Sequence, residues 1–365
     1  MRALAAGQKG KEYRMIRPSV ARKAGARRHA ARAINISEVA AAAGVSVATV
    51  SRALQKPQLV ATRTRALVQR AVKRLGYTPN AQARMLRTAR SNVVVALVPD
   101  IANPFFAEVI RGIEQVAHQT GYSVLLGDTQ YDRKREQAYA DLLATKQADG
   151  LITLLPHIPR TAPGVVAPIV NACEYVKDPS IASVYIDNVA AAREATAFLL
   201  TLGHRSIAFV TGPMSSPICV DRSDGYKAAL RTAGLKRDPR LMVAGDFSFE
   251  SGVRAFESLS SGKHKLTAVF CSNDEMAIGV IRAAKARGLR VPEDISVVGF
   301  DDIRFARYSD PPLTTIAQPK DELGREAMKM LIEILTDRDV RPRKRILPTQ
   351  LVVRGSTAPL RPPKS

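Results

Sequence analysis

Hydroxyl, methyl and guanidinium groups follow one another in the stretch GVSVATVSRAL, which spans residues 44–54. Serine and threonine hydroxyls can bond phosphates or base edges, small apolar side chains can touch a thymine methyl group, and an arginine can make a bidentate contact to guanine. A short helix with small leading residues can enter the major groove closely. The stretch therefore predicts DNA contacts at Ser46, Val47, Ala48, Thr49, Ser51 and Arg52.

Positive charge is concentrated in the same part of the chain. The 365 residues carry a formal net charge of +22. Residues 1–33 and residues 34–90 each contain ten Lys or Arg against a single acidic residue, so most of the net charge lies in the first quarter of the sequence. A charge block of this kind is the electrostatic footprint of a polyanionic partner, with nucleic acid the first candidate. A solvated basic surface without a specific partner is the alternative.

Two short helices must position the candidate DNA contacts. Ser37 is a suitable N-cap for a helix over Glu38–Ala43, and Gly44 can end that helix. Ser46 can cap a second helix over Val47–Leu54. A short glycine-containing turn between two such helices is typical of the helix-turn-helix motif, although an ordinary helical hairpin has the same pattern.

A third helix completes this predicted unit. Apolar residues recur at helical spacing from Leu67 to Leu75, and Gly76 can stop the helix. The apolar residues of the three helices can share one small core. Residues 34–78 therefore predict an all-α helix-turn-helix DNA-binding headpiece.

A hinge helix and linker are predicted over residues 79–90. Pro79 prevents the preceding helix from continuing, and Asn80 can cap a short helix over residues 81–87. An apolar side chain flanked by arginines suits insertion into a DNA minor groove, although a flexible linker is the alternative. The candidate DNA contacts of this region are Tyr77, Asn80, Ala83 and Leu86.

The first 33 residues are rich in Ala, Arg and Gly and have no periodic apolar face, so we expect a disordered basic arm. A secretory signal would need an apolar region, which this segment lacks; a transit peptide, or a true start at Met15, remains an alternative. No apolar run approaches the ~20 residues of a membrane span. The three cysteines are far apart, which predicts reduced thiols and a cytoplasmic location.

Residues 91–365 show short apolar strands alternating with amphipathic helices. This alternation predicts parallel sheets covered by helices, and it restarts after Asn188, which indicates two α/β subdomains. The pair resembles a periplasmic-binding-protein-like core, with one subdomain over about residues 91–189 and 317–356 and the other over 190–316. A ligand is expected in the cleft, at the carboxyl ends of the strands.

An enzyme is the disfavoured interpretation. The sequence has no glycine-rich dinucleotide turn, no phosphate-binding loop and no serine nucleophile elbow. The five histidines are scattered without metal-ligand spacing, and His204 in LGHRS is expected to be a structural turn residue. We therefore predict no catalytic residue, no metal and no cofactor. An exported solute-binding protein is also disfavoured, because it would need an export signal.

The headpiece, the hinge and a series of downstream motifs together resemble the lactose and purine repressor family. The motifs are NPFFAEVIRGIE, DGLITL, YIDN, LGHRSIAFV, TAVFCSNDEMAIG, VPEDISVVGFDD and PPLTTIAQP, and the resemblance covers about Ile34 to Ser356. Ala83 and Leu86 match the family's hinge pattern. Within the family, DPPLTTIAQP, GREAM and GDFSFESG are most similar to the cytidine-responsive repressors.

The resemblance implies a ligand site at Phe105, Phe106, Asp187, Arg222, Phe247, Asn273 and Asp301. Two carboxylates and a guanidinium suit the vicinal hydroxyls of a ribose, and phenyl rings can stack on a base. Core packing is the alternative for the phenyl rings, and helix capping for Asp301. Ser216 and Ile218 stand where the purine repressor has the arginine and threonine that read the purine. A nucleoside such as cytidine is therefore favoured over a purine or a sugar.

The resemblance also implies how such a protein acts. It predicts a ligand-responsive transcriptional regulator, a repressor, that binds a roughly palindromic double-stranded DNA operator as a homodimer. Effector binding would close the cleft and change whether the two hinge helices can form together. The sequence leaves the sign of the response open.

Overall fold

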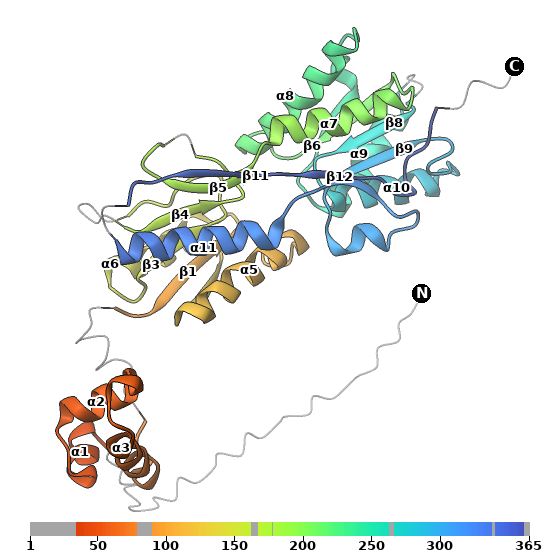
Figure 1. The fold of residues 1–365 in the computed structure, drawn as a ribbon. Coiled ribbons are helices and arrows are strands. Elements are labelled where there is room, and N and C mark those ends of the chain that lie inside the picture. Colours follow the sequence, from red (N-terminus) through yellow and green to blue (C-terminus); the bar gives the residue numbers. More distant parts are fainter. Residues whose placement is uncertain are drawn as a thin grey trace, which may run out of the picture. The chain divides into compact units, whose positions relative to one another are not determined.

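The computed structural model describes residues 34–78, 90–161, 167–176, 178–262, 266–337 and 340–360 (Figure 1). The chain divides into two compact units, Met1–Ala81 and Gln82–Ser365. The predicted arm over residues 1–33 and all of the predicted hinge before residue 90 lie outside the described residues.

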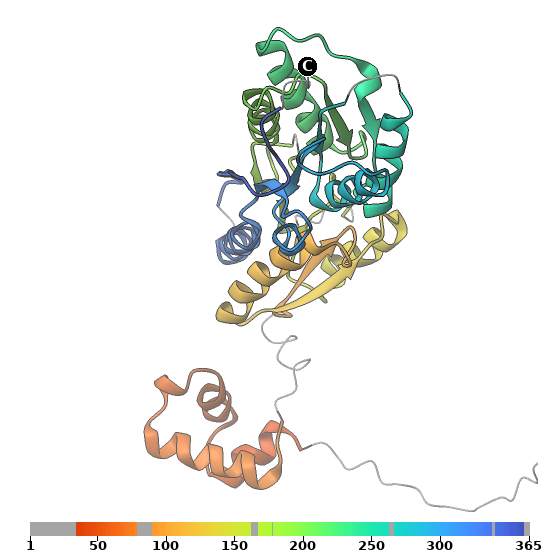
Figure 2. The ribbon, with the colours of Figure 1, turned by 90° about the vertical axis from the view of Figure 1, so that its right-hand side faces the viewer.

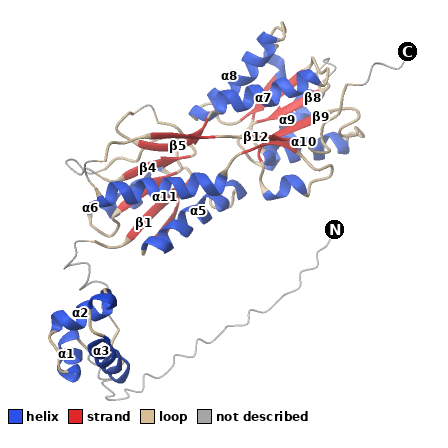
Figure 3. Cartoon of the chain, in the orientation of Figure 1, coloured by secondary structure: helices blue, strands red, loops and turns tan. Residues whose placement is uncertain are grey.

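The described part of the first unit is the predicted all-α headpiece (Figure 3). Its helices are α1 (Ile36–Ala43), α2 (Val47–Gln55) and α3 (Thr62–Leu75), with a 3₁₀ turn over Pro57–Leu59. Gly44 and Gly76 end α1 and α3 in the left-handed conformation, with φ of 65° and 64°, as the sequence predicted. Ser46 caps α2 by accepting a hydrogen bond from the Thr49 amide.

The predicted cap of α1 was wrong. Asn35, not Ser37, is the N-cap: its Oδ1 accepts from the Glu38 amide at 3.0 Å, and Glu38 Oε2 accepts from the Asn35 amide at 2.8 Å. This reciprocal capping box satisfies two backbone N–H groups at once, whereas a serine cap at residue 37 would satisfy one. The helix therefore starts at Ile36.

Apolar residues from all three helices form the headpiece core. Val39, Val50 and Val68 are completely buried at its centre. Leu67, which lies at core spacing in the sequence, is instead exposed. The headpiece core is small, because only three short helices enclose it. Each buried side chain therefore supplies a large share of the packing contacts in the headpiece.

The first subdomain of the second unit is built on a six-stranded sheet of order β11-β5-β4-β3-β1-β2, in which all paired strands are parallel. Buried runs of Val, Ile, Leu and Ala form its central strands, as expected for a sheet covered on both faces. The strands are β1 (Val93–Val98), β2 (Ser123–Asp128), β3 (Gly150–Thr153), β4 (Ile169–Ala172), β5 (Ala182–Ile186) and β11 (Lys344–Leu347). Its helices are α5 (Pro104–Thr120), α6 (Arg133–Ala144) and α11 (Lys320–Thr336).

The second subdomain repeats this plan with the sheet order β12-β10-β9-β8-β6-β7. Its strands are β6 (Ile207–Thr211), β7 (Met242–Ala244), β8 (Ala268–Cys271), β9 (Ser296–Asp301), β10 (Thr314–Ala317) and β12 (Gln350–Val352). Its helices are α7 (Asn188–Thr201), α8 (Pro217–Thr232), α9 (Phe249–Ser260) and α10 (Asp274–Ala286), with 3₁₀ turns over Pro239–Leu241 and Arg304–Arg307.

The chain crosses between the two sheets three times: after β5, after β10, and between β11 and β12. The last crossing differs from the predicted boundary, which assigned residues 317–356 to the first subdomain. Residues 350–352 pair antiparallel with β10 and so belong to the second sheet. A three-residue edge strand has too short a pattern to be assigned to either sheet from sequence.

Two glycines let α5 and α11 pack closely on the first subdomain, where the helices lie side by side (Figures 1 and 2). A Cβ on Gly112 would lie 2.0 Å from the Asp321 carbonyl oxygen, and one on Gly324 would lie 2.0 Å from the Val109 carbonyl oxygen. Each helix thus presents a glycine to the backbone of the other. This contact fixes the start of α11, which immediately follows a crossing between the subdomains.

None of the described helices is both long and apolar enough to cross a membrane. Across the described ranges, His, Cys, Asp and Glu side chains form no group of three that could hold a metal ion.

Candidate ligand cavity and DNA-facing helix

A cavity of about 410 Å³ lies between the two subdomains. Its walls come from loops that follow strands of both sheets, such as Pro99 after β1, Leu154 after β3 and Pro213 near the end of β6. This is the carboxyl edge of each sheet, where parallel α/β folds bind ligands. The lining residues are Pro99, Asn103, Phe105, Phe106, Tyr131, Leu154, Pro156, Cys173, Glu174, Pro213, Ser215, Ser216, Ile218, Arg222, Asp246, Phe247, Asn273, Asp301 and Gln318.

Six of the seven predicted ligand residues line this cavity: Phe105, Phe106, Arg222, Phe247, Asn273 and Asp301.

The structure places Asp187 outside the cavity. Its Oδ1 caps α7 by accepting from the Ala190 amide at 2.9 Å, and the residue lines a separate surface hollow. The following residue, Asn188, is buried and accepts a hydrogen bond from Arg222 Nε at 2.9 Å. Asp187 therefore caps the first turn of α7, and the side-chain amide of Asn188 holds Arg222 at the cavity.

Arg222 is held from several sides. It is 3% exposed, and besides Asn188 its Nη1 donates to the Ser272 carbonyl oxygen. Its guanidinium lies over the Phe300 ring, 3.8 Å from the ring centroid, which is a cation–π arrangement. Its Nη2 lies 4.0 Å from Asp301 Oδ1. These contacts fix the orientation of the guanidinium before any ligand binds.

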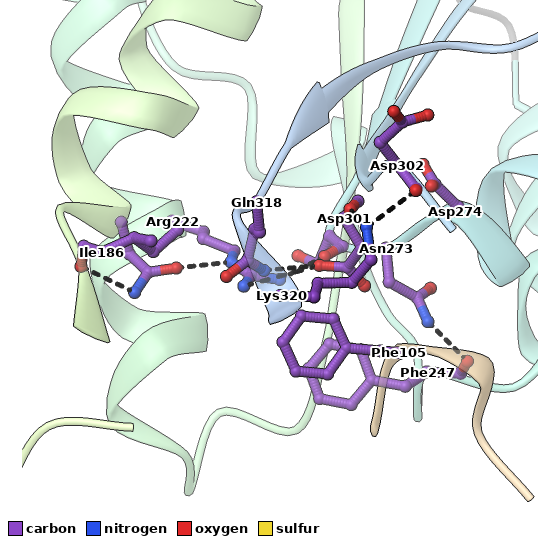
Figure 4. Close-up of polar contacts among 12 residues, drawn as sticks. Phe105, Ile186, Arg222, Phe247, Asn273, Asp274, Asp301, Asp302, Gln318 and Lys320 are labelled. Carbon is purple, nitrogen blue, oxygen red and sulfur yellow. Dashed lines mark hydrogen bonds and ion pairs between the residues drawn. The ribbon is translucent and has the colours of Figure 1, made fainter. Parts of the chain in front are cut away.

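Asp301 is the second fixed charge of the cavity (Figure 4). Gln318 Nε2 donates to its Oδ1 at 2.7 Å, while Lys320 Nζ donates to its backbone oxygen at 2.7 Å. Burial raises the pKa of Asp301 to about 6, although Arg222 and Gln318 act to lower it. The carboxyl is therefore predominantly ionised at neutral pH and can accept hydrogen bonds from ligand hydroxyls.

Backbone strain gathers around the cavity. Eight described residues other than glycine have positive φ, and four of them line it. These four are Tyr131 (58°), Cys173 (70°), Phe247 (70°) and Asp301 (111°). Such conformations are costly for residues with a side chain and cluster at functional sites, where the surrounding structure enforces them.

The aromatic residues approach from both subdomains. Phe105 and Phe106 open α5 and contact each other edge to face, with ring centroids 5.2 Å apart. Phe247 lines the cavity from the loop before α9, and Asn273 Nδ2 donates to its carbonyl oxygen at 2.8 Å (Figure 4). Asn273 Oδ1 also caps α10 by accepting from the Met276 amide. In this structure Asn273 positions the strained Phe247 loop.

Sequence reasoning missed several polar residues of the cavity, above all Glu174. It lies two residues past the end of β4, 8% exposed, and accepts a hydrogen bond from Ser216 Oγ at 3.2 Å. The usable signal was its position: the first polar side chains after a buried parallel strand lie at the ligand edge of the sheet. The other missed polar or acidic lining residues are Asn103, Tyr131, Ser215, Asp246 and Gln318.

The predicted DNA contacts on α2 differ in how far they are exposed to solvent. Ser46, Val47, Ala48 and Arg52 are exposed and Thr49 is partly exposed, which leaves them available to a groove. Ser51 is 8% exposed and sits with the core-facing residues of the helix, so it is not presented on that surface. Tyr77 packs partly against the headpiece core. Asn80, Ala83 and Leu86 lie outside the described residues.

Comparison with known proteins identifies both parts of the chain. Residues 35–80 match the family model for bacterial regulatory proteins of the lacI family, and residues 196–357 match a periplasmic binding protein-like domain. The HTH-type transcriptional repressor CytR of Escherichia coli K12 is 42% identical over 332 residues, covering 90% of this chain and 97% of the relative. The ribose operon repressor of the same strain is 36% identical, covering 88% and 99%.

Solved structures agree with the sequence comparisons. The Lac repressor dimer bound to operator and the anti-inducer ONPF superposes with a TM-score of 0.80 at 29% identity, covering 89% of this chain and 99% of that chain. A complex of the transcriptional regulator CelR with cellobiose gives a TM-score of 0.69 at 33% identity, covering 88% and 99%. A relative this similar over nearly its whole length shows the family, and the chain belongs to the lacI family of bacterial regulatory proteins.

Proposed function

We propose that this lacI-family transcriptional repressor is controlled by a nucleoside, with cytidine the first candidate. The observation that carries the proposal is the make-up of the cavity: a fixed Arg222 and Asp301 face phenyl rings from both subdomains. The charged pair suits the hydroxyls of a ribose and the rings suit the faces of a base.

The names of the relatives support the same choice. CytR is the relative with 42% identity, and the others include a ribose operon repressor and PurR of Vibrio atlanticus. Ser216 and Ile218, which replace the purine-reading pair of the purine repressor, both line the cavity. A sugar effector is the second candidate, favoured by the cellobiose complex of CelR.

The proposed action follows from the fold. The exposed face of α2 reads an operator as part of a homodimer in the cytoplasm. The effector binds between the two subdomains, which are joined by three crossings of the chain. Because the effector contacts both subdomains, it binds more tightly to one relative arrangement of them and stabilises that arrangement. The difference in effector affinity between the two arrangements sets how strongly operator binding changes.

Calorimetry of the full chain against cytidine, adenosine, ribose, glucose and free bases tests the effector. We expect the tightest binding for a nucleoside. Gel shifts with genomic fragments, with and without that nucleoside, then test the response. Tight binding of a free sugar, with no detectable binding of any nucleoside, would refute the nucleoside assignment and leave the family assignment intact.

A further inference from the structure

A buried lysine joins the two subdomains beside the cavity (Figure 4). Lys320 is the first residue of α11, which packs on the first subdomain, and it is 5% exposed. Its Nζ donates to the backbone oxygen of Asp301 at 2.7 Å and to that of Asp302 at 2.8 Å. Both acceptors lie at the end of β9, in the second subdomain. A lysine is seldom this buried unless its ammonium is fully paired, so the contact is a specific one.

The backbone that Lys320 holds is strained. Asp301 and Asp302 have φ of 111° and 51°. Such conformations persist in residues with a side chain only where the surrounding contacts enforce them, and Lys320 contacts the carbonyl oxygens of both. The Asp301 carboxyl lines the cavity, whereas Lys320 does not. Lys320 therefore fixes the backbone of a candidate ligand residue from outside the cavity.

The same ammonium also faces α5 of the first subdomain. Lys320 Nζ lies 3.8 Å from Oε2 of Glu108. The first turn of α5 carries Phe105 and Phe106, which line the cavity. An ammonium has three protons, so it can hold two carbonyl oxygens and a carboxylate at once. Lys320 thus connects the Asp301 wall of the cavity to the helix that supplies its phenyl rings.

The far end of α11 lies at the predicted hinge. The helix has 17 residues and is therefore about 25 Å long, and it runs along the first subdomain (Figure 1). In its last turn the Leu335 carbonyl oxygen accepts a hydrogen bond from Arg90 Nη2 at 2.9 Å. Arg90 is the last residue of the predicted hinge and linker. One helix therefore contacts the cavity wall at its start and the end of the hinge segment at its finish.

We propose that Lys320 couples ligand binding in the cavity to operator binding. A ligand on the Asp301 carboxyl favours one position of the end of β9 relative to the first subdomain, and Lys320 passes that preference to α5 and α11. Lys320 is a positioning residue, because it acts through the backbone of Asp301. The inference rests on the proposed function and names the residue that carries its response.

Measurements at saturating ligand separate coupling from binding. Operator affinity of the full chain is measured by gel shift without ligand and with cytidine, and in a parallel series with ribose, at concentrations that saturate each variant by calorimetry. A residue that only supports ligand binding has no effect once the cavity is full, whereas a coupling residue still has one. Wild type should change its operator affinity by about fivefold or more on saturation, and Lys320→Met by less than about twofold.

Thermodynamic linkage gives an independent readout. Operator must change cytidine affinity by the same factor as cytidine changes operator affinity, so this factor should also approach one in Lys320→Met. Glu108→Gln should lower both factors, because it removes the charge that Lys320 faces on α5. Lys227→Met is the matched control: Lys227 pairs with Asp224 at 3.0 Å within α8, so its loss should leave both factors at the wild-type values.

Each outcome decides between the two proposals. Lys320→Met with the wild-type response at saturation overturns the coupling role and leaves the proposed function standing. If Lys320→Met does not bind operator even without ligand, Glu108→Gln decides, and wild-type factors in that variant overturn the coupling role. A wild type that responds to ribose and not to cytidine overturns the nucleoside assignment, and the same variants then judge the coupling with ribose. A wild type that responds to neither compound overturns both proposals.

Discussion

At the scale of single residues, the cavity depends on side chains whose orientation is fixed before the ligand arrives. Arg222 is held by two hydrogen bonds and an aromatic face, and Asp301 by Gln318 and its own strained backbone. Preorganised charged groups lose little freedom on binding, so more of their interaction energy becomes affinity. Removing one of them should therefore be costly for the ligand.

Asp301→Asn should weaken nucleoside binding by about tenfold to a hundredfold, because each charge-assisted hydrogen bond is worth about 1.5–3 kcal/mol. Operator binding without effector should survive, giving a protein that no longer responds. Asp187→Asn is the control, because Asp187 caps α7 outside the cavity, and it should leave affinity unchanged. Equal losses in the two variants, measured by calorimetry, would count against a ligand role for Asp301.

Asp301 should also make nucleoside affinity depend on pH. The pKa of Asp301 is raised to about 6, and the ionised form is the better acceptor for ribose hydroxyls. Affinity should therefore be full above this pKa and decline as the pH falls through it. Asp301→Asn should flatten this decline, which calorimetry with a nucleoside from pH 5 to pH 8 would measure.

Two adjacent residues of α2, Ser51 and Arg52, should respond differently to substitution. Arg52→Ala should cost roughly 1–3 kcal/mol at the operator if this exposed arginine reads a guanine. Ser51→Ala changes a buried residue of α2 and should affect headpiece stability more than operator preference. Selection from random operators checks both. A Val47 and Ala48 double variant that selects the same operators as wild type would refute the major-groove assignment.

At the scale of elements, sequence patterns located the three headpiece helices and indicated the alternation of strands and helices in two α/β subdomains, because these amphipathic and buried runs are long. The failures were at short or paired features. Ser37 was a plausible cap, but the reciprocal bonds of Asn35 and Glu38 depend on two residues together. Asp187 was predicted to bind the ligand. Because α7 begins at Asn188, Asp187 becomes its N-cap, and it is Asn188 that supports the cavity through Arg222. Glu174 has no motif and is found only from the strand order.

The capping box of α1 can be tested against the mistaken cap. Asn35→Ala should destabilise the headpiece by about 0.5–2 kcal/mol, since it removes the bond to the Glu38 amide and half of the capping box. Ser37→Ala should have a much smaller effect, because Ser37 is not the cap residue. Hydrogen exchange of the headpiece amides in the full chain measures both. Amides of the second unit should keep their protection in either variant.

At the scale of the whole molecule, the excess of positive charge and the ligand cavity lie in different parts of the chain. Residues 1–90 hold most of the net charge of +22, whereas the remaining residues carry nearly balanced charges and the cavity. The two binding reactions should therefore respond differently to salt. A neutral nucleoside releases no counterions, whereas DNA releases one for most of the phosphates that are neutralised.

Operator affinity should consequently fall on the order of 10³-fold between 50 and 200 mM salt for about six phosphate contacts. Cytidine affinity, measured on the same preparation, should change little over that range. Deleting residues 1–33 removes ten of the basic residues, so it should weaken nonspecific DNA binding more than operator preference. An unchanged salt slope together with unchanged nonspecific affinity in the truncated protein would show that this segment makes no contact with DNA, and would place the phosphate contacts within the headpiece and hinge.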